Sequence, residues 1–146
     1  SGGGDEEDGE PLMEPEKVLK NKDDTDEIEL DLKCKLYRYS KEERDWKDAG
    51  TGSFRITRDM ASSKHRMLVR NPIGRINFNA GFYKGMKVTQ EGKGGLKFAA
   101  FVVTEEIGTD SKVHPKTEMK TFLIKVSSAE VGRALAKMDQ CIAALE

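Results

Sequence analysis

The sequence has few of the residues and motifs from which enzyme active sites and metal centres are usually built. It contains two histidines and two cysteines, and it has no Gly-x-Ser-x-Gly, Gly-x-x-x-x-Gly-Lys-[Ser/Thr] or His-Glu-x-x-His motif. Cys34 and Cys141 stand in no Cys-x-x-Cys or Cys/His spacing, so we expect buried, reduced thiols of a cytosolic or nuclear protein. We therefore expect no catalysis, no cofactor and no metal site.

Long apolar runs are also missing. No stretch of about 18 consecutive apolar residues occurs, so the sequence predicts a soluble protein with no membrane insertion. The 146 residues are 36% hydrophobic and 35% charged, which suits one domain with its own core and an appendage.

The formal net charge of −1 conceals a strong asymmetry along the chain. Residues 1–31 carry 13 acidic residues against three lysines, whereas residues 32–146 carry 22 lysines and arginines against 13 acidic residues. The acidic segment has too little apolar content to offset the entropy of ordering, so we predict a disordered arm over 1–31, of which 1–4 resemble a linker or cloning remnant. Such arms either keep a protein in solution or bind a partner, and both interpretations stay open.

Residues 32–146 alternate apolar and polar side chains in short runs separated by turn residues, which is typical of a mainly β domain. Seven strands are expected, over 32–39, 53–57, 65–70, 75–79, 85–89, 96–105 and 118–126. A capping-box spacing, Ser127 to Glu130, then introduces a helix. The apolar stripe of this helix is Val131, Leu135, Met138, Ile142 and Leu145. This order of elements predicts a seven-stranded antiparallel barrel or sandwich capped by a C-terminal α-helix.

Positive charge is concentrated in residues 53–79. Five arginines and one lysine occur there against Asp59 alone. If the apolar residues of the three strands face inward, the alternation places most of these arginines on one outer face, with Leu68 as an apolar foothold among them. Arginine binds carboxylates and phosphates through its planar fork, so this face predicts an anionic partner.

The sequence favours one class of anionic partner over the others. The face has no interleaved aromatic residues, which argues against nucleic acid. The first predicted loop, residues 40–50, has a net charge of −1, which is unfavourable for a lipid phosphate. An acidic peptide can spread its carboxylates along the strands and is preferred. An extended, proline-rich peptide is also considered, with Phe82 and Tyr83 as candidate groove residues, and an anionic lipid stays an alternative.

Two stretches carry a resemblance to a known family. The sequence "KLYRYSKEERDWKDAGTGSFRI" at 35–56 and the sequence "RMLVRNPIGRINFN" at 66–79 resemble the Ran-binding domain, and the resemblance covers about residues 33–145. It is closest to the divergent type carried by nuclear pore proteins. The resemblance implies a pleckstrin-homology-like fold and binding to the GTP form of the small GTPase Ran, whose acidic tail lies on the basic face. The residues implied in partner binding are Trp46, Lys47, Arg55, Arg66, Leu68, Arg70, Arg75 and Asn79.

The same resemblance implies a cellular setting: the nucleus, at the nuclear pore and preferably on its nucleoplasmic side, with transport receptors of the importin and exportin type reached through Ran. A monomer is expected. Ala49 and Asn71 stand where the family usually has basic residues, so affinity for an acidic tail should be lower than that of other members. For the single tryptophan, Trp46, we expect a double role, in which its ring closes the barrel and its loop presents Lys47 to the GTPase. A purely structural plug is the alternative.

Overall fold

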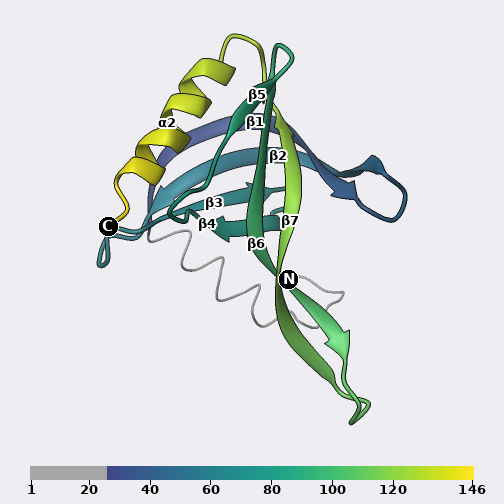
Figure 1. Ribbon diagram of the computed structural model, residues 1–146. Helices are drawn as coiled ribbons and strands as arrows, with labels where there is room; N and C mark the ends of the chain where they lie inside the picture. Colours follow the sequence, from purple (N-terminus) through teal and green to yellow (C-terminus); the bar gives the residue numbers. More distant parts are fainter. Residues whose placement is uncertain (1–25) are drawn as a thin grey trace.

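A computed structural model describes residues 26–146 as one antiparallel sheet with a helix against it (Figure 1). Within these residues seven strands are joined in the order β4-β3-β2-β1-β7-β6-β5. The elements are β1 Glu27–Ser40, β2 Asp45–Arg58, β3 His65–Arg70, β4 Ile76–Gly81, β5 Thr89–Glu91, β6 Gly95–Ile107, β7 Val113–Lys125 and α2 Val131–Ala143. The predicted mainly β fold with seven antiparallel strands and a C-terminal helix is confirmed.

The sheet curves strongly, so that its two ends enclose one core. The ring of Phe78 on β4 lies 4.7 Å from that of Phe122 on β7 and 5.9 Å from that of Phe98 on β6, centroid to centroid. The inward alternation predicted for β2 and β3 is confirmed, since Phe54 and Met67 are completely buried. The enclosed core therefore lies on one face of β2, β3 and β4, and their other face is available for polar residues.

The first strand begins earlier than the composition suggested. β1 starts at Glu27, so residues 27–31 belong to the folded domain and not to a disordered arm. Leu30 is 3% exposed and belongs to the core, and the strand's acidic residues lie opposite basic residues of β2, with Glu27 beside Arg58 in the register. The rest of the predicted arm, residues 1–25, lies outside the described residues.

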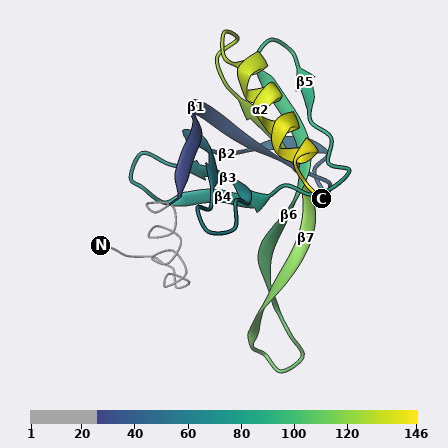
Figure 2. The same ribbon diagram turned by 90° about the vertical axis from the view of Figure 1, so that its left-hand side faces the viewer.

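The two long hairpins are also more regular than expected. β2 begins at Asp45, so most of the predicted first loop is strand and only residues 41–44 form the turn. In the second hairpin, β7 begins at Val113, five residues earlier in the chain than the sequence predicted. In Figures 1 and 2 the distal part of the β6–β7 hairpin extends well beyond the rest of the sheet.

The C-terminal helix packs on the open side of the curved sheet (Figure 2). Its buried residues are Val131, Ala134, Met138 and Cys141. Leu135 and Ile142 are only partly buried against the core, so the buried stripe is rotated from the predicted one. No side-chain cap bond forms at the helix start; the Ser127 carbonyl accepts the amides of Glu130 and Val131. The predicted capping box is therefore wrong.

Both cysteines are buried free thiols. Desolvation by burial raises the pKa of Cys34 and of Cys141 to about 11, so both are protonated and unreactive at neutral pH. In the part of the chain that the structure describes, no helix is long and apolar enough to cross a membrane.

Candidate binding face

The arginines predicted to share one face are brought together by the register of β2, β3 and β4. Arg55 on β2 lies opposite Leu68 on β3, and Leu68 lies opposite Asn79 on β4. Arg66 and Arg70 are two residues to either side of Leu68 along β3, so they project from the same face. We call Arg55, Arg66, Leu68, Arg70 and Asn79 the arginine face.

Neighbouring acceptors orient the guanidinium groups of this face. Nε of Arg66 donates a hydrogen bond of 2.9 Å to Oδ1 of Asn79. Arg70 donates a 2.7 Å bond to the Gly74 carbonyl, and Arg55 lies 3.3 Å from the Asp31 carboxylate on β1. A guanidinium group carries five N–H donors, so the single bond to Asn79 can fix the direction of Arg66 without exhausting its binding capacity. The face is therefore already arranged before any partner arrives.

Leu68 does not offer the exposed apolar contact that the sequence predicts. It is on the arginine face by register, but only 4% of its surface is exposed. A side chain with so little exposure offers almost no area to a partner. The polar atoms of the arginine face, rather than Leu68, are the groups that could make contact.

Arg75 lies at the end of this face, in the turn between β3 and β4. The Asn71 side chain shapes this turn, because its Oδ1 accepts the backbone amide of Arg75 at 2.8 Å and that of Ile73 at 3.2 Å. Asn71 therefore has a turn-forming role.

Trp46 and Lys47 lie elsewhere, at the outer end of the β1–β2 hairpin. Trp46 pairs with Tyr39 in the register, and the two rings meet edge to face with centroids 5.3 Å apart. Trp46 is partly buried but lies outside the core cluster and the residues packed on it, so the prediction that its ring closes the barrel is wrong. Lys47 forms an ion pair with Glu43 in the hairpin turn.

The structure therefore separates the predicted site residues into two groups. Nine positions along β2 divide Trp46 from Arg55, which corresponds to roughly 30 Å of extended strand. A partner would have to be large, or bind with an extended segment, to touch both groups at once. Their roles in binding stay predictions.

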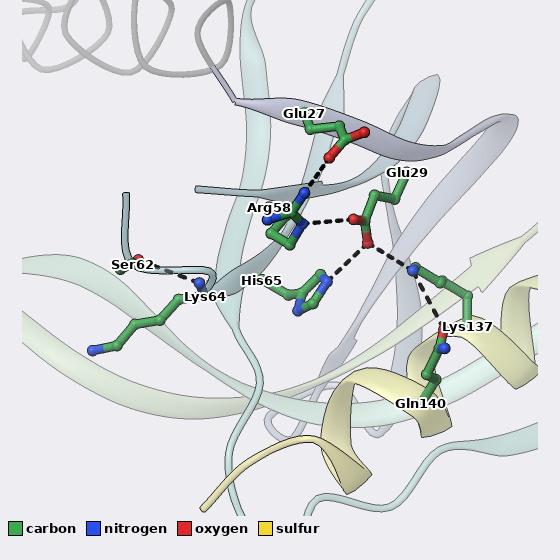
Figure 3. Close-up of polar contacts among 8 residues, drawn as sticks. All are labelled: Glu27, Glu29, Arg58, Ser62, Lys64, His65, Lys137 and Gln140. Carbon is green, nitrogen blue, oxygen red and sulfur yellow. Dashed lines mark hydrogen bonds and ion pairs between the residues drawn. The ribbon is translucent and has the colours of Figure 1, made fainter. Parts of the chain in front are cut away.

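Sequence reasoning missed a cluster of charged residues around Glu29 (Figure 3). One carboxylate oxygen of Glu29 lies 2.6 Å from Nζ of Lys137 on α2 and 2.8 Å from Nε2 of His65, and the other accepts a 2.8 Å bond from Nε of Arg58. The bond with Lys137, followed by those with Arg58 and His65, lowers the pKa of Glu29 to about 2 despite the opposing effect of burial. Arg58 also pairs with Glu27.

This cluster fixes the helix to the sheet. Glu29 stands where the β1–β2 register shifts, between Ile28 and Leu30, and the extra residue of such a bulge can be directed away from the regular pattern. Its carboxylate thus reaches β2, β3 and α2 together. The signal in the sequence was weak, because an isolated glutamate in an acidic segment does not reveal basic partners far along the chain.

Phe82 and Tyr83, the candidate groove residues for an extended peptide, are both partly buried against the core. Their role towards such a peptide stays a prediction. The Tyr83 ring packs 5.1 Å from that of Phe101, and its hydroxyl donates a 2.9 Å bond to the Ala99 carbonyl. Both side chains are engaged in holding the segment before β5 against β6.

Comparison with known proteins identifies the family. A family model described as the RanBP1 domain matches residues 18–143. The chain belongs to this family. RanBP1 domains are non-enzymatic binding modules for Ran, and the residues of the two quoted stretches fall within the matched range.

Curated relatives agree with the assignment to the RanBP1 domain family. The chain is 28% identical to Ran-binding protein 1 homolog c of Arabidopsis thaliana over 146 aligned positions, covering 92% of this chain and 66% of that protein. It is 38% identical to Ran-binding protein 1 homolog b of the same plant over 58 positions, covering 40% of this chain and 26% of that protein. The chain thus spans about two thirds or less of these curated relatives.

Two solved structures share the fold. The Ran-binding domain of Nup2 from Ashbya gossypii superposes with a TM-score of 0.62 at 20% identity, over 84% of this chain and 99% of that one. The EVH1 domain of Dm DCP1, solved with an XRN1 peptide, gives a TM-score of 0.61 at 12% identity, over 95% and 99% of the two chains. These likenesses establish the pleckstrin-homology-like, EVH1-like fold.

Proposed function

We propose that this RanBP1 domain binds Ran in its GTP-bound form and acts in nucleocytoplasmic transport as part of a nuclear pore protein. The observation that carries the proposal is the arginine face: three arginines of β2 and β3 project from one surface in a domain of this family. An acidic tail of the GTPase is the partner segment that we assign to this face, because arginine binds carboxylates through paired N–H donors.

Arg66 is the central residue of the proposed contact. Asn79 holds its Nε, and within residues 26–146 its two terminal nitrogens have no hydrogen-bond or ion-pair partner. A carboxylate placed beside these nitrogens would gain charge-assisted hydrogen bonds without first breaking an existing one. The cost of orienting the guanidinium group is met before binding, which favours affinity.

Selectivity for the GTP form follows from the tail being available in only one state. A domain shifts an equilibrium between two states only by the difference of its affinities for them. If the tail is sequestered in Ran-GDP and released in Ran-GTP, capture of the tail on the arginine face favours the GTP form. The domain performs no hydrolysis in this scheme.

The test is titration calorimetry of the chain against Ran loaded with a non-hydrolysable GTP analogue and, separately, with GDP, at two salt concentrations. We expect heat with the GTP form alone, and weaker binding at the higher salt concentration. Arg66→Ala should weaken binding by about 10-fold or more, as expected for loss of charge-assisted bonds. The matched control is Arg133→Ala on α2, which removes an exposed ion pair with Glu130. This variant should bind as the wild type does.

Absence of heat in both nucleotide states, with a folded domain, would reject the Ran assignment. The anionic-lipid and extended-peptide alternatives would then be tested by vesicle pelleting and peptide titration. A weakening by Arg133→Ala equal to that by Arg66→Ala would reject the arginine face as the specific contact.

The acidic arm is part of the proposal as a modulator of the same contact. Residues 1–25 lie outside the described residues, and two of their expected roles predict opposite results. If the arm contacts Ran, its deletion weakens the calorimetric binding; if it competes for the arginine face, its deletion strengthens binding. Residues 27–31 must be kept in such a deletion, because they belong to β1.

The cellular setting that we propose is the nucleus, at the nuclear pore and preferably on its nucleoplasmic side, with transport receptors reached through Ran. The support is the family and the likeness in fold to the Ran-binding domain of Nup2. Localisation of the tagged full-length protein tests it; a diffuse cytoplasmic signal would contradict the pore assignment. Sedimentation of the isolated chain tests the proposed monomer.

A further inference from the structure

The projecting part of the β6–β7 hairpin has one apolar face that the Ran proposal does not use. Phe101 lies opposite Met119 in the register, and Ile107 lies opposite Val113. Residues directly opposite one another, and residues two apart along a strand, share a face. The exposed apolar residues of this face are Phe101 (47% exposed), Val103 (70%), Ile107 (76%), Val113 (58%) and Met119 (45%).

The two faces of the hairpin differ in how their charges are paired. On the other face, Glu106 lies 3.3 Å from Nζ of Lys116, and Glu118 accepts a 2.8 Å bond from the Thr104 hydroxyl. Glu105 is on the apolar face, between Val103 and Ile107, and is exposed. Among residues 26–146 its carboxylate has no ion-pair partner. The apolar face thus presents one negative charge with an apolar neighbour on each side along the strand.

The outer edge of β6 is open along this same stretch. Within the described residues, β5 pairs only with Gly95–Lys97 of β6, and the Ala99 carbonyl is then taken by the Tyr83 hydroxyl. Every second residue of an antiparallel strand turns its N–H and C=O to the same side. Phe101, Val103, Glu105 and Ile107 therefore direct their backbone groups to the open edge, in phase with Ala99.

The β7 edge of the hairpin is different, because it is interrupted by Pro115. Pro115 lies opposite Glu105, and a proline has no N–H to offer to an added strand. An open edge without such protection is a ready site for pairing with another chain. Of the two edges, β6 is the one suited to strand addition.

We infer that the outer edge of β6 binds an extended peptide segment of a partner protein, which adds as a strand and carries an apolar-x-basic-x-apolar sequence. The basic residue lies beside Glu105, and the two apolar residues lie beside Val103 and Ile107. Opposite charges directly across two strands stabilise the pairing, and like charges weaken it. A second copy of this chain fits less well, because antiparallel pairing centred on Glu105 would place two glutamates side by side.

The experiment uses the full chain labelled with ¹⁵N and a synthetic peptide, Ser-Thr-Val-Thr-Lys-Thr-Ile-Thr-Ser, acetylated and amidated at its ends. We expect amide signals of residues 101–107 to shift on titration with the peptide. A second peptide, with glutamate replacing the lysine, should bind about 5- to 10-fold more weakly, since the cross-strand charge pair changes from attractive to repulsive.

Charge reversal in the domain provides the decisive comparison. Glu105→Lys should reverse the preference, so that the glutamate peptide binds more tightly than the lysine peptide. Glu106→Lys is the matched control, because it makes the same change one residue away on the other face, and the preference for the lysine peptide should remain. The amide spectrum of each variant reports whether the domain is folded.

Three results would overturn the inference: no shift of the 101–107 amides at about millimolar peptide, equal affinity for both peptides, or an unchanged preference in Glu105→Lys. Signals of 101–107 that move with protein concentration alone, and that the peptide does not reverse, would assign the edge to a second copy and overturn it as well. The outcome is independent of the Ran proposal, because Glu105→Lys should leave the calorimetric binding of Ran unchanged.

Discussion

The carboxylate of Glu29 lies 2.6 Å from Nζ of Lys137, and this contact joins the first strand to the C-terminal helix. The same carboxylate binds Arg58 on β2 and His65 on β3 (Figure 3). The Glu29 and Lys137 side chains are each only 20% exposed, so solvent screens the ion pair less than it screens the surface pairs. The Glu29 carboxylate on β1 thus contacts β2, β3 and the helix together.

Replacing this carboxylate by a neutral amide should measure its contribution to stability. We expect Glu29→Gln to lower the free energy of unfolding by about 1–3 kcal/mol, because three donors lose a charged acceptor. Urea unfolding at neutral pH measures the change. Glu130→Gln removes a carboxylate from the exposed pair with Arg133 and should cost about 0.5 kcal/mol or less. Equal losses in the two variants would show that the Glu29 cluster is no stronger than a surface pair.

The pH dependence of stability should carry the signature of the same group. The cluster lowers the pKa of Glu29 from its usual 4.5 to about 2. A carboxyl group with a depressed pKa in the folded state stabilises the protein above its unfolded pKa, and this stabilisation is lost as pH falls towards the folded value. The difference in unfolding free energy between wild type and Glu29→Gln should therefore be constant above about pH 5 and shrink between 4.5 and about 2. A constant difference down to pH 2 would contradict the depressed pKa.

Gly52 should tolerate no side chain. A Cβ added there would lie 2.1 Å from the Arg70 carbonyl oxygen and 2.9 Å from Cα of Asn71, both of which are backbone atoms that cannot swing aside. We expect Gly52→Ala to destabilise the domain by about 1–3 kcal/mol, and to displace Arg70 of the arginine face. Gly81→Ala, where no atom lies within 4 Å of the new Cβ, should change stability by about 0.5 kcal/mol or less. Thermal unfolding of both variants tests the pair.

Trp46→Ala separates a structural role from a binding role. Because the ring contacts Tyr39 outside the core, we expect a loss of about 0.5–1.5 kcal/mol, the range of an aromatic pair. Phe54→Ala in the core should cost about 3–5 kcal/mol. A loss of Ran affinity in Trp46→Ala with little loss of stability would place Trp46 in the interface. A stability loss as large as that of Phe54→Ala would restore the interpretation of Trp46 as a plug.

The sequence predicted best where local alternation decides the structure. Phe54 and Ile56 flank Arg55, and Met67 and Val69 lie between Arg66 and Arg70 with Leu68 in the middle; all four predicted inward residues are buried. The arginine face follows from the same alternation, since side chains between inward residues must point outward. These regularities need no knowledge of distant parts of the chain.

The misses share one physical cause, which is that the deciding partner is remote in sequence. The acidic composition of their own segment predicts disorder for Glu27 and Glu29, but Arg58 on β2 supplies the compensating positive charge. The charged segment around Trp46 predicts a loop, but this segment pairs with β1 and forms part of a strand. In α2, the curvature of the sheet selects Ala134 and Cys141 for burial, and helix periodicity alone cannot reveal that curvature.

The central position of β1 in the sheet also has a consequence for how the domain folds. One edge of β1 is completed by β2, directly after it in the chain, but the other is completed by β7, with Lys35 paired to Lys125. Closing such a long chain segment is slow compared with forming a hairpin. During synthesis, β1 and β2 can therefore pair early, while the second edge of β1 stays unpaired until β7 has emerged from the ribosome. The domain acquires its complete fold only when translation has passed its C-terminal helix.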